Sequence, residues 1–331
     1  MTRVPPVRAV QISELTGPQG LKLVDVPEPE AAHPLAGDGR VVVIDVEAAG
    51  VSFPEVLQSR GEYQLKPDLP FIPGAEVAGT VRSASEGSRL QPGDRVATMC
   101  MLGGFAEVAV APEFLTFPLA GELEVAQGAG LILNYHTAYF SLVTRGRLQE
   151  GETVLVHGAA GGVGTATLQV AKGLGARTFA VVSDDEKEEV ARRAGADEVF
   201  RSGGPWKDEV REAGRADLVI DPVGGDRMTD SLRSLKEEGR VVVVGFTGGS
   251  IPEVKVNRLL LNNVSVVGAG WGAYVLSKPA TCAEIQGKID ELVASGHVRP
   301  IVGARLPLER AAEALELIDG RRALGKVVLD V

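Results

Sequence analysis

Cysteine is scarce in this sequence, and the two present, Cys100 and Cys282, stand far apart without a Cys-x-x-Cys spacing. This excludes a disulfide framework and a zinc site built from cysteines. No hydrophobic run is long enough to span a membrane, and the first residues, MTRVPPVRAVQISEL, lack the apolar segment of a signal peptide. We therefore expect a cytoplasmic protein with no membrane partner.

Positive charge is also in deficit, since the formal net charge is −10. Non-specific binding to nucleic acid needs a basic face, so we expect no nucleic-acid partner. What the sequence does have is length and apolar residues: 331 residues, 44% of them hydrophobic, suffice for two well-packed domains.

The first part of the chain, residues 1–128, consists of short strand-like runs separated by proline and glycine. Turn sequences such as Ile72-Pro73-Gly74 and Gln91-Pro92-Gly93-Asp94 divide these runs. Many short strands with turn signals between them predict a compact β-barrel.

From Thr153 onward, strand-like runs alternate with helical ones, which predicts a parallel doubly wound sheet and an α/β fold. In such a sheet the ligand lies at the carboxyl ends of the strands. The tail from 270 to 331 carries no second nucleotide motif, and we expect it to complete the first domain.

The centre of the pattern is the stretch Gly151–Lys172, GETVLVHGAAGGVGTATLQVAK, which predicts a buried strand, a glycine-rich turn and a helix. The unpaired amides at that helix start would seat a pyrophosphate. Read as A-x-G-x-x-G from Ala159, the turn lacks the first glycine of the usual dinucleotide motif. By itself the motif therefore leaves open a turn that binds no nucleotide.

Around this turn, the residues Gly151-Glu152, Ala159–Gly162, Gly164, Gln169 and Lys172 resemble the signature of a known family. These are the zinc-independent quinone oxidoreductases, the zeta-crystallin-like branch of the medium-chain dehydrogenase/reductase superfamily. Further matches are Gly50–Leu57, Gly61–Tyr63, Phe71–Glu76, Pro92–Val96, Gly195–Asp197 and Gly325–Val328.

The resemblance implies a GroES-like catalytic domain over 1–128, completed by 270–331, and a Rossmann domain over 129–269. It further implies NADPH in the cleft and a homodimer. The apolar run Val264–Ala269 is the edge we expect to pair with a second subunit, because an uncovered apolar edge favours aggregation.

The choice of nicotinamide cofactor depends on the end of the second Rossmann strand. A carboxylate there would select NAD, whereas this strand ends in Ser183, which leaves room for a 2′-phosphate. We expect Lys187 and Arg201 to supply positive charge, Arg201 through a bidentate fork; the alternative is that both are surface charges. Asp184 and Asp185 would repel the phosphate if they point inward, or cap the next helix.

The resemblance also assigns the other cofactor contacts. They are Ala160, Gly161, Gly162 and Val163 in the turn, and Asn134, Val223, Phe246 and Thr247 elsewhere, with Thr137 as a pocket residue near the nicotinamide amide.

No metal is expected. Zinc alcohol dehydrogenases of the superfamily place cysteine and histidine where this chain has Ser52 and Ala75, and its four histidines show no ligand spacing. Without a Lewis acid, reduction of an electron-poor acceptor is favoured over alcohol oxidation.

The candidate catalytic residues are Ser52, Tyr63 and Thr137. A phenol can donate a hydrogen bond or proton to a reduced carbonyl or quinone oxygen, although Tyr63 could equally be a packed aromatic. We predict an NADPH-dependent, metal-free reductase of quinones or α,β-unsaturated carbonyls. An enoyl- or acryloyl-CoA-type thioester reductase and an NADPH-binding module with little turnover stay open as alternatives.

Overall fold

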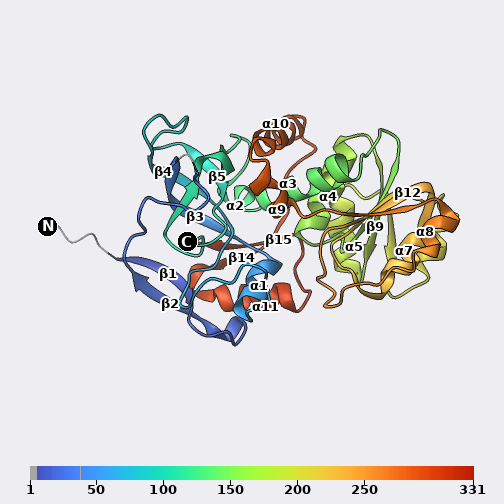
Figure 1. The fold of residues 1–331 in the computed structure, drawn as a ribbon, viewed down its shortest axis with the longest axis horizontal. Coiled ribbons are helices and arrows are strands. Elements are labelled where there is room, and N and C mark those ends of the chain that lie inside the picture. The colour runs from blue at the N-terminus through green and yellow to red at the C-terminus, as the bar shows by residue number, and fades with distance from the viewer. Residues whose placement is uncertain (1–5, 38) are drawn as a thin grey trace. The chain divides into compact units, whose positions relative to one another are not determined.

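The computed structural model describes residues 6–37 and 39–331 (Figure 1). Its residues form two compact units by mutual contact, Met1–Leu133 with Pro300–Val331, and Asn134–Arg299. Helices α9 (Trp271–Ser277) and α10 (Ala280–Ala294) belong to the second unit, where α10 contacts α4 (Gly162–Gly173). The domain limits predicted from the sequence, at 128/129 and 269/270, stay a prediction.

The first unit is built around a seven-stranded mixed sheet in the order β14-β15-β3-β4-β5-β7, with β6 paired to β3. The C-terminal strand β15 lies antiparallel to β3, so strands that are far apart in the sequence contribute to one sheet. Its elements are β3 (Val41–Val51), α1 (Phe53–Ser59), β4 (Glu76–Ala84), β5 (Arg95–Met99), β6 (Val108–Pro112), β7 (Thr116–Pro118), α2 (Val125–Gly128), β14 (Val302–Pro307), α11 (Ala311–Asp319) and β15 (Lys326–Asp330). A separate hairpin pairs β1 (Val7–Ile12) with β2 (Leu21–Val26).

The second unit contains six parallel strands in the order β10-β9-β8-β11-β12-β13, coloured green to orange in Figure 1. This is the doubly wound order in which the third, second and first strands precede the fourth, fifth and sixth. The strands are β8 (Thr153–His157), β9 (Arg177–Val182), β10 (Glu198–Arg201), β11 (Ala216–Asp221), β12 (Leu235–Val243) and β13 (Ser265–Gly268). The helices between them are α4, α5 (Asp185–Arg193), α6 (Trp206–Glu212), α7 (Met228–Ser234) and α8 (Asn257–Asn262), and α3 (Ile132–Tyr139) leads into the unit.

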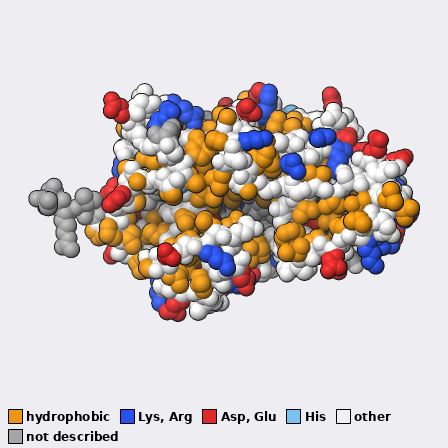
Figure 2. Space-filling view, viewed as in Figure 1, with side chains coloured by type: hydrophobic (Ala, Val, Ile, Leu, Met, Phe, Trp, Pro, Cys, Tyr) orange, Lys and Arg blue, Asp and Glu red, His pale blue; other side chains and the backbone are white. Residues whose placement is uncertain are grey.

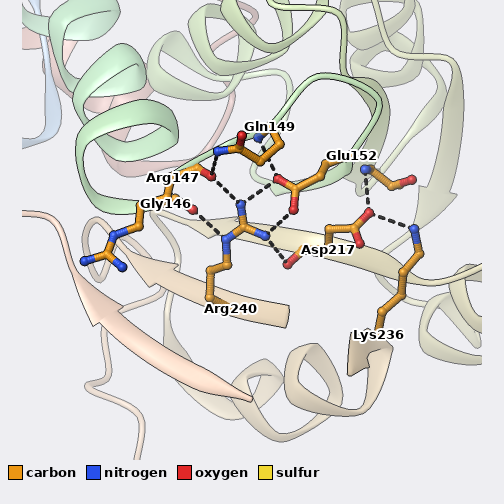
Figure 3. Close-up of polar contacts among 8 residues, drawn as sticks. Gly146, Arg147, Gln149, Glu152, Asp217, Lys236 and Arg240 are labelled. Carbon is orange, nitrogen blue, oxygen red and sulfur yellow. Dashed lines mark hydrogen bonds and ion pairs between the residues drawn. The ribbon is translucent and has the colours of Figure 1, made fainter. Parts of the chain in front are cut away.

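An arginine network holds the edge of this sheet that lies opposite the carboxyl ends (Figure 3). Arg240 in β12 donates to the carboxylate of Glu152 at 2.6 and 2.7 Å and to the carbonyl oxygen of Gly146 at 2.5 Å. Beside it, the Asp217 carboxylate accepts from the Thr153 amide at 2.8 Å and from Lys236 at 2.7 Å. Because these bonds join β8, β11 and β12, they fix the strands whose other ends carry the candidate site.

The apolar residues pack on each sheet as the alternating pattern predicts. In the second unit the core includes Leu155, Phe179, Val219 and Val241, all fully buried. Within the described part of the chain, no helix has the length and apolar character to cross a membrane.

Candidate active site

The glycine-rich turn joins β8 to α4 and exposes the start of that helix. Gly161 is the N-cap, and its amide donates to the Gly158 carbonyl at 3.0 Å. The first amides of α4 have no acceptors within the helix, and they point out of its N-terminus, which is the positive end of the helix dipole. Such a helix start can hold an anion, and phosphate binding at this turn stays a prediction.

Close backbone packing explains the last glycine of the turn. A Cβ at Gly164 would lie 2.2 Å from the Gly158 carbonyl oxygen, whereas a Cβ at Gly161 would meet nothing nearer than 3.5 Å. Gly164 thus lets the helix pack against its own turn, and Gly161 leaves space beside it.

Several of the predicted cofactor residues surround this turn. A Cβ at Gly162 would meet the Asn134 amide nitrogen at 2.6 Å, so the buried Asn134 side chain covers the start of α4. Thr137 lies three residues further along α3, on the same side of the helix, and is 9% exposed. The structure therefore places Asn134 beside the glycine-rich turn and Thr137 further along the same helix; the roles of both residues stay predictions.

The loops after β11 and β12 form the neighbouring wall. Val223 lies against Gly158, and Phe246 lies against Gly224, 2.9 Å from the position of a Cβ there. Thr247 donates its hydroxyl to the Pro222 carbonyl at 3.1 Å. Three strand ends, those of β8, β11 and β12, thus meet where the sequence predicts the ligand.

Asp221 organises that wall, a role which sequence reasoning missed. Its Oδ1 accepts from the amides of Val223 and Gly224, both at 2.9 Å, and the residue is fully buried. A carboxylate that ends an apolar strand just before a Pro-Val-Gly-Gly turn was the available signal, since aspartate commonly bonds to the backbone of a following turn.

The predicted 2′-phosphate residues lie together at the ends of β9 and β10. Lys187 donates to the Ser183 hydroxyl at 2.7 Å, and Arg201 pairs in register with Val182, next to Ser183. Asp184 is the N-cap of α5, and its Oδ1 accepts from the Lys187 amide at 3.0 Å, as the capping alternative predicts. Its Oδ2 also accepts from the Ser183 hydroxyl and pairs with the Lys187 ammonium at 3.0 Å, so the carboxylate lies among the predicted phosphate residues as well. Contact with Ser183, followed by the backbone and charge of Lys187, lowers the pKa of Asp184 to about 2.

Arg201 is not a free cation here. Its Nη2 contacts Asp185 at 2.5 Å and also Glu188, so the guanidinium is paired with acids of α5. Among the described residues its Nη1 atom is buried without a hydrogen-bond partner. The Arg201 guanidinium, predicted to bind a phosphate, is therefore already paired with two carboxylates. Sequence reasoning identified Asp185 but missed Glu188.

In the first unit, Ser52 lies at the start of α1 in a capping box with Glu55. Glu55 is fully buried; its Oε2 accepts from the Ser52 amide and its Oε1 from the Ala75 amide, both at 2.9 Å. Burial raises the pKa of Glu55 to about 7, and the charge of Lys326 opposes that shift.

Lys326 completes this cluster and is a second residue that sequence reasoning missed. Its Nζ donates to the Ser52 hydroxyl oxygen at 2.7 Å and contacts the Glu76 carboxylate. The signal was a lysine at the head of the apolar strand Val327-Val328-Leu329, where burial of a charge needs a partner.

Tyr63 is half-buried in the segment after α1. Burial raises the pKa of its phenol, and the charge of Glu55 adds to the shift, so the hydroxyl keeps its proton and can donate. Ser52 and Tyr63 thus share Glu55 as a neighbour.

The described residues contain no group of three or more His, Cys, Asp and Glu side chains with metal-binding geometry. At the positions that correspond to the zinc ligands, the structure instead has the Ser52 hydroxyl bonded to an ammonium, and the Ala75 amide bonded to Glu55. Zinc independence stays a prediction.

The comparisons with known proteins agree with this architecture. Residues 37–121 match the family model "Alcohol dehydrogenase GroES-like domain", and residues 162–286 match "Zinc-binding dehydrogenase". A Bos taurus protein named quinone oxidoreductase-like protein 2 is 35% identical over 98% of this chain and 92% of its own length.

Solved structures match over nearly the whole chain. A probable oxidoreductase from Mycobacterium abscessus is 43% identical with a TM-score of 0.89, covering 98% of this chain and 99% of its own. The Thermus thermophilus quinone oxidoreductase, described also in complex with NADPH, is 34% identical with a TM-score of 0.82, covering 98% of this chain and all of its own. The predicted α/β fold with a GroES-like domain and a Rossmann domain is confirmed, and the chain belongs to the quinone oxidoreductase family of the medium-chain dehydrogenases/reductases.

Proposed function

We propose that this oxidoreductase binds NADPH and reduces a quinone or the β-carbon of an α,β-unsaturated carbonyl. The observation that carries the proposal is the junction of three strand ends, where Asn134 lies against the start of α4, Val223 against Gly158 and Phe246 against Gly224. Solved members of the family with NADPH, among them the Thermus thermophilus enzyme, support the choice of cofactor.

The residues present fit the dinucleotide. The turn offers helix amides to a pyrophosphate, and the space beside Gly161 admits its oxygens. At the end of β9 stands Ser183, with Lys187 in contact, where an NAD-selective site would place a carboxylate. We propose that Ser183, Lys187 and Arg201 bind the 2′-phosphate, with Arg201 exchanging one of its carboxylate partners for it.

This cofactor site predicts a measurable selectivity. Arg201→Glu should raise the KM for NADPH tenfold or more and the KM for NADH less than twofold, because a charge-assisted bond to the 2′-phosphate contributes roughly 1.5–3 kcal/mol. Equal effects on both cofactors would refute the role of Arg201.

When bound, NADPH supplies a hydride to the acceptor carbon. The chain's own residues serve the acceptor oxygen, on which negative charge develops. We propose that Ser52 and Tyr63 donate hydrogen bonds to that oxygen and that Thr137 orients the nicotinamide amide. Tyr63→Phe should lower kcat about tenfold or more, since it removes one donor to the developing charge; unchanged turnover would exclude Tyr63 from the mechanism.

The activity is tested by following the loss of NADPH absorbance in the presence of quinones, enals and acyl-CoA thioesters. Turnover with quinones or enals supports the proposal. Turnover with thioesters alone favours the thioester reductase, and no turnover with any acceptor favours an NADPH-binding module. The same assay after dialysis against a chelator should show full activity, which tests the proposed independence of zinc.

We also propose a homodimer that forms through the edge of the Rossmann sheet. Strand β13 pairs only with β12 among the described strands, and hydrophobic side chains gather over α8 beside it (Figure 2). Leu260 and Leu261 are 78% and 75% exposed. Leu260→Asp with Leu261→Asp should yield a monomer by light scattering; a wild-type protein that is itself monomeric would refute the dimer.

A further inference from the structure

The buried Lys326 contacts the hydroxyl of Ser52, which we propose as a hydrogen-bond donor to the substrate oxygen. Lys326 is the first residue of β15 and is 3% exposed, and Glu76, its ion-pair partner, is 1% exposed. Its ammonium also donates to the Ser52 oxygen at 2.7 Å. Ser52 itself is partly exposed, so of the three residues it is the one that is not fully buried.

The surrounding backbone makes room for this side chain. A Cβ at Gly50 would lie 2.8 Å from Lys326 Cε and 2.7 Å from Glu76 Cγ, and a Cβ at Gly130 would lie 2.9 Å from Lys326 Cγ. Two glycines thus border one lysine. Burial of an ion pair seldom stabilises a protein more than apolar residues of the same volume would, so packing alone gives no reason for this arrangement.

The hydrogen-bond roles follow from the groups themselves. An ammonium can only donate, so the Ser52 oxygen accepts from Lys326. The same oxygen faces the amide of Glu55 in the capping box, which also can only donate. Because neither the ammonium nor the amide can accept, the Ser52 proton is left for a different acceptor.

We propose that Lys326 is a positioning residue that makes Ser52 a proton donor of fixed direction and raised acidity toward the acceptor oxygen. As the hydride arrives with its electron pair at the acceptor carbon, the acceptor oxygen takes the proton of the Ser52 O–H bond. The Ser52 oxygen then takes a proton from water on its exposed side, which leaves hydroxide, while Lys326 stays protonated and keeps its bond to Ser52. Glu76 holds Lys326 in place through its Oε1, and its Oε2 accepts from the Leu133 amide at 3.0 Å, which fixes the carboxylate.

This assignment rests on the proposed reductase activity, and its test is a mutant cycle. Lys326→Met with Glu76→Gln removes both charges without leaving either one unpaired, and Gln can still accept from the Leu133 amide. This double variant, Ser52→Ala and the triple variant are compared for kcat at saturating NADPH and for the NADPH dissociation constant. A matched control, Arg240→Met with Glu152→Gln, neutralises the largely buried ion pair of the Rossmann unit.

If Lys326 acts through Ser52, the double variant lowers kcat about tenfold and Ser52→Ala at least tenfold. The triple variant then lies within about twofold of Ser52→Ala, because non-additivity marks groups that act as one. The NADPH dissociation constant stays within about twofold throughout, and the Arg240 control changes kcat by less than about twofold.

If the Lys326→Met double variant does not fold, Lys326→Gln with Glu76→Gln takes its place, since an amide retains a neutral donor; its expected loss is smaller. The assignment is overturned if the Lys326 and Glu76 substitutions lower kcat by the same factor in the Ser52→Ala background as in wild type. It is also overturned if the Arg240 control loses as much kcat as the Lys326 double variant. Failure of the proposed function is distinct: wild-type protein then shows no turnover with any acceptor, which overturns both.

Discussion

Glu55 should make the stability of this protein depend on pH in a direction opposite to that of most carboxylates. Its pKa is raised from 4.5 to about 7, with burial as the largest cause. Between these two values the folded protein holds a proton that the unfolded chain has released. Stability from this group is therefore fully present below pH 4.5 and is lost as the pH rises through about 7.

The magnitude follows from linkage. Each unit of pKa difference corresponds to about 1.4 kcal/mol, so the change between pH 5 and pH 8 is roughly 2–3 kcal/mol. Glu55→Gln removes the titrating group and keeps one acceptor for the amides of Ser52 and Ala75.

The assay is urea unfolding of wild type and Glu55→Gln at both pH values, followed by a signal from the first unit. The difference between the two proteins isolates Glu55 from His136 and His157, whose pKa values are lowered by burial to about 4 and whose contribution has the opposite sign. Wild type should lose roughly 2–3 kcal/mol more than the variant on going from pH 5 to pH 8. Parallel pH profiles would show that Glu55 is ionised throughout and refute the reasoning.

Three further predictions concern the second unit. Gly164→Ala should destabilise it by about 1–3 kcal/mol, because its Cβ would meet the Gly158 carbonyl at 2.2 Å, whereas Gly161→Ala, with 3.5 Å of space, should leave the melting temperature nearly unchanged; similar melting temperatures would contradict this. Glu188→Gln should lower the KM for NADPH by roughly twofold or more, since it releases Arg201 from one carboxylate, and an increase would indicate that Glu188 orients Arg201 productively. Arg240→Met should cost roughly 2–4 kcal/mol in urea unfolding, because Glu152 and the Gly146 carbonyl lose their donor; a loss below about 0.5 kcal/mol would mean that water replaces the guanidinium.

The Rossmann unit could be predicted from the sequence in large part because its signals are local. The strand Thr153–His157 contains the apolar run Val154–Val156, and the glycines that follow it must bend the backbone in a small space. Alternation of strands and helices then limits the connections to parallel ones. The placement of Val223 and Phe246 after the carboxyl ends of β11 and β12 follows from that topology together with the family resemblance.

The pairing of charged side chains could not be predicted in this way. Arg201 was expected to bind a phosphate, and the structure shows it paired with Asp185 and Glu188 on the first turn of α5. Asp185 and Glu188 lie 16 and 13 residues away in sequence. Composition and spacing do not say which of several nearby acids a guanidinium selects, because that depends on the register of β10 against β9.

The contrast between two ion pairs shows what separates a structural charge from one placed for chemistry. Arg240 and Glu152 link the starts of three strands. Every hydrogen bond of the Arg240 guanidinium in Figure 3 goes to a backbone carbonyl or to the Glu152 carboxylate. Lys326 and Glu76 are more deeply buried, yet Lys326 uses one donor on the hydroxyl of Ser52, which is partly exposed. Since Lys326 lies 250 residues from Glu76 and 274 from Ser52, only the antiparallel pairing of β15 with β3 brings its charge to this hydroxyl. The pairing of the C-terminal strand with β3 is thus what places a charge behind Ser52.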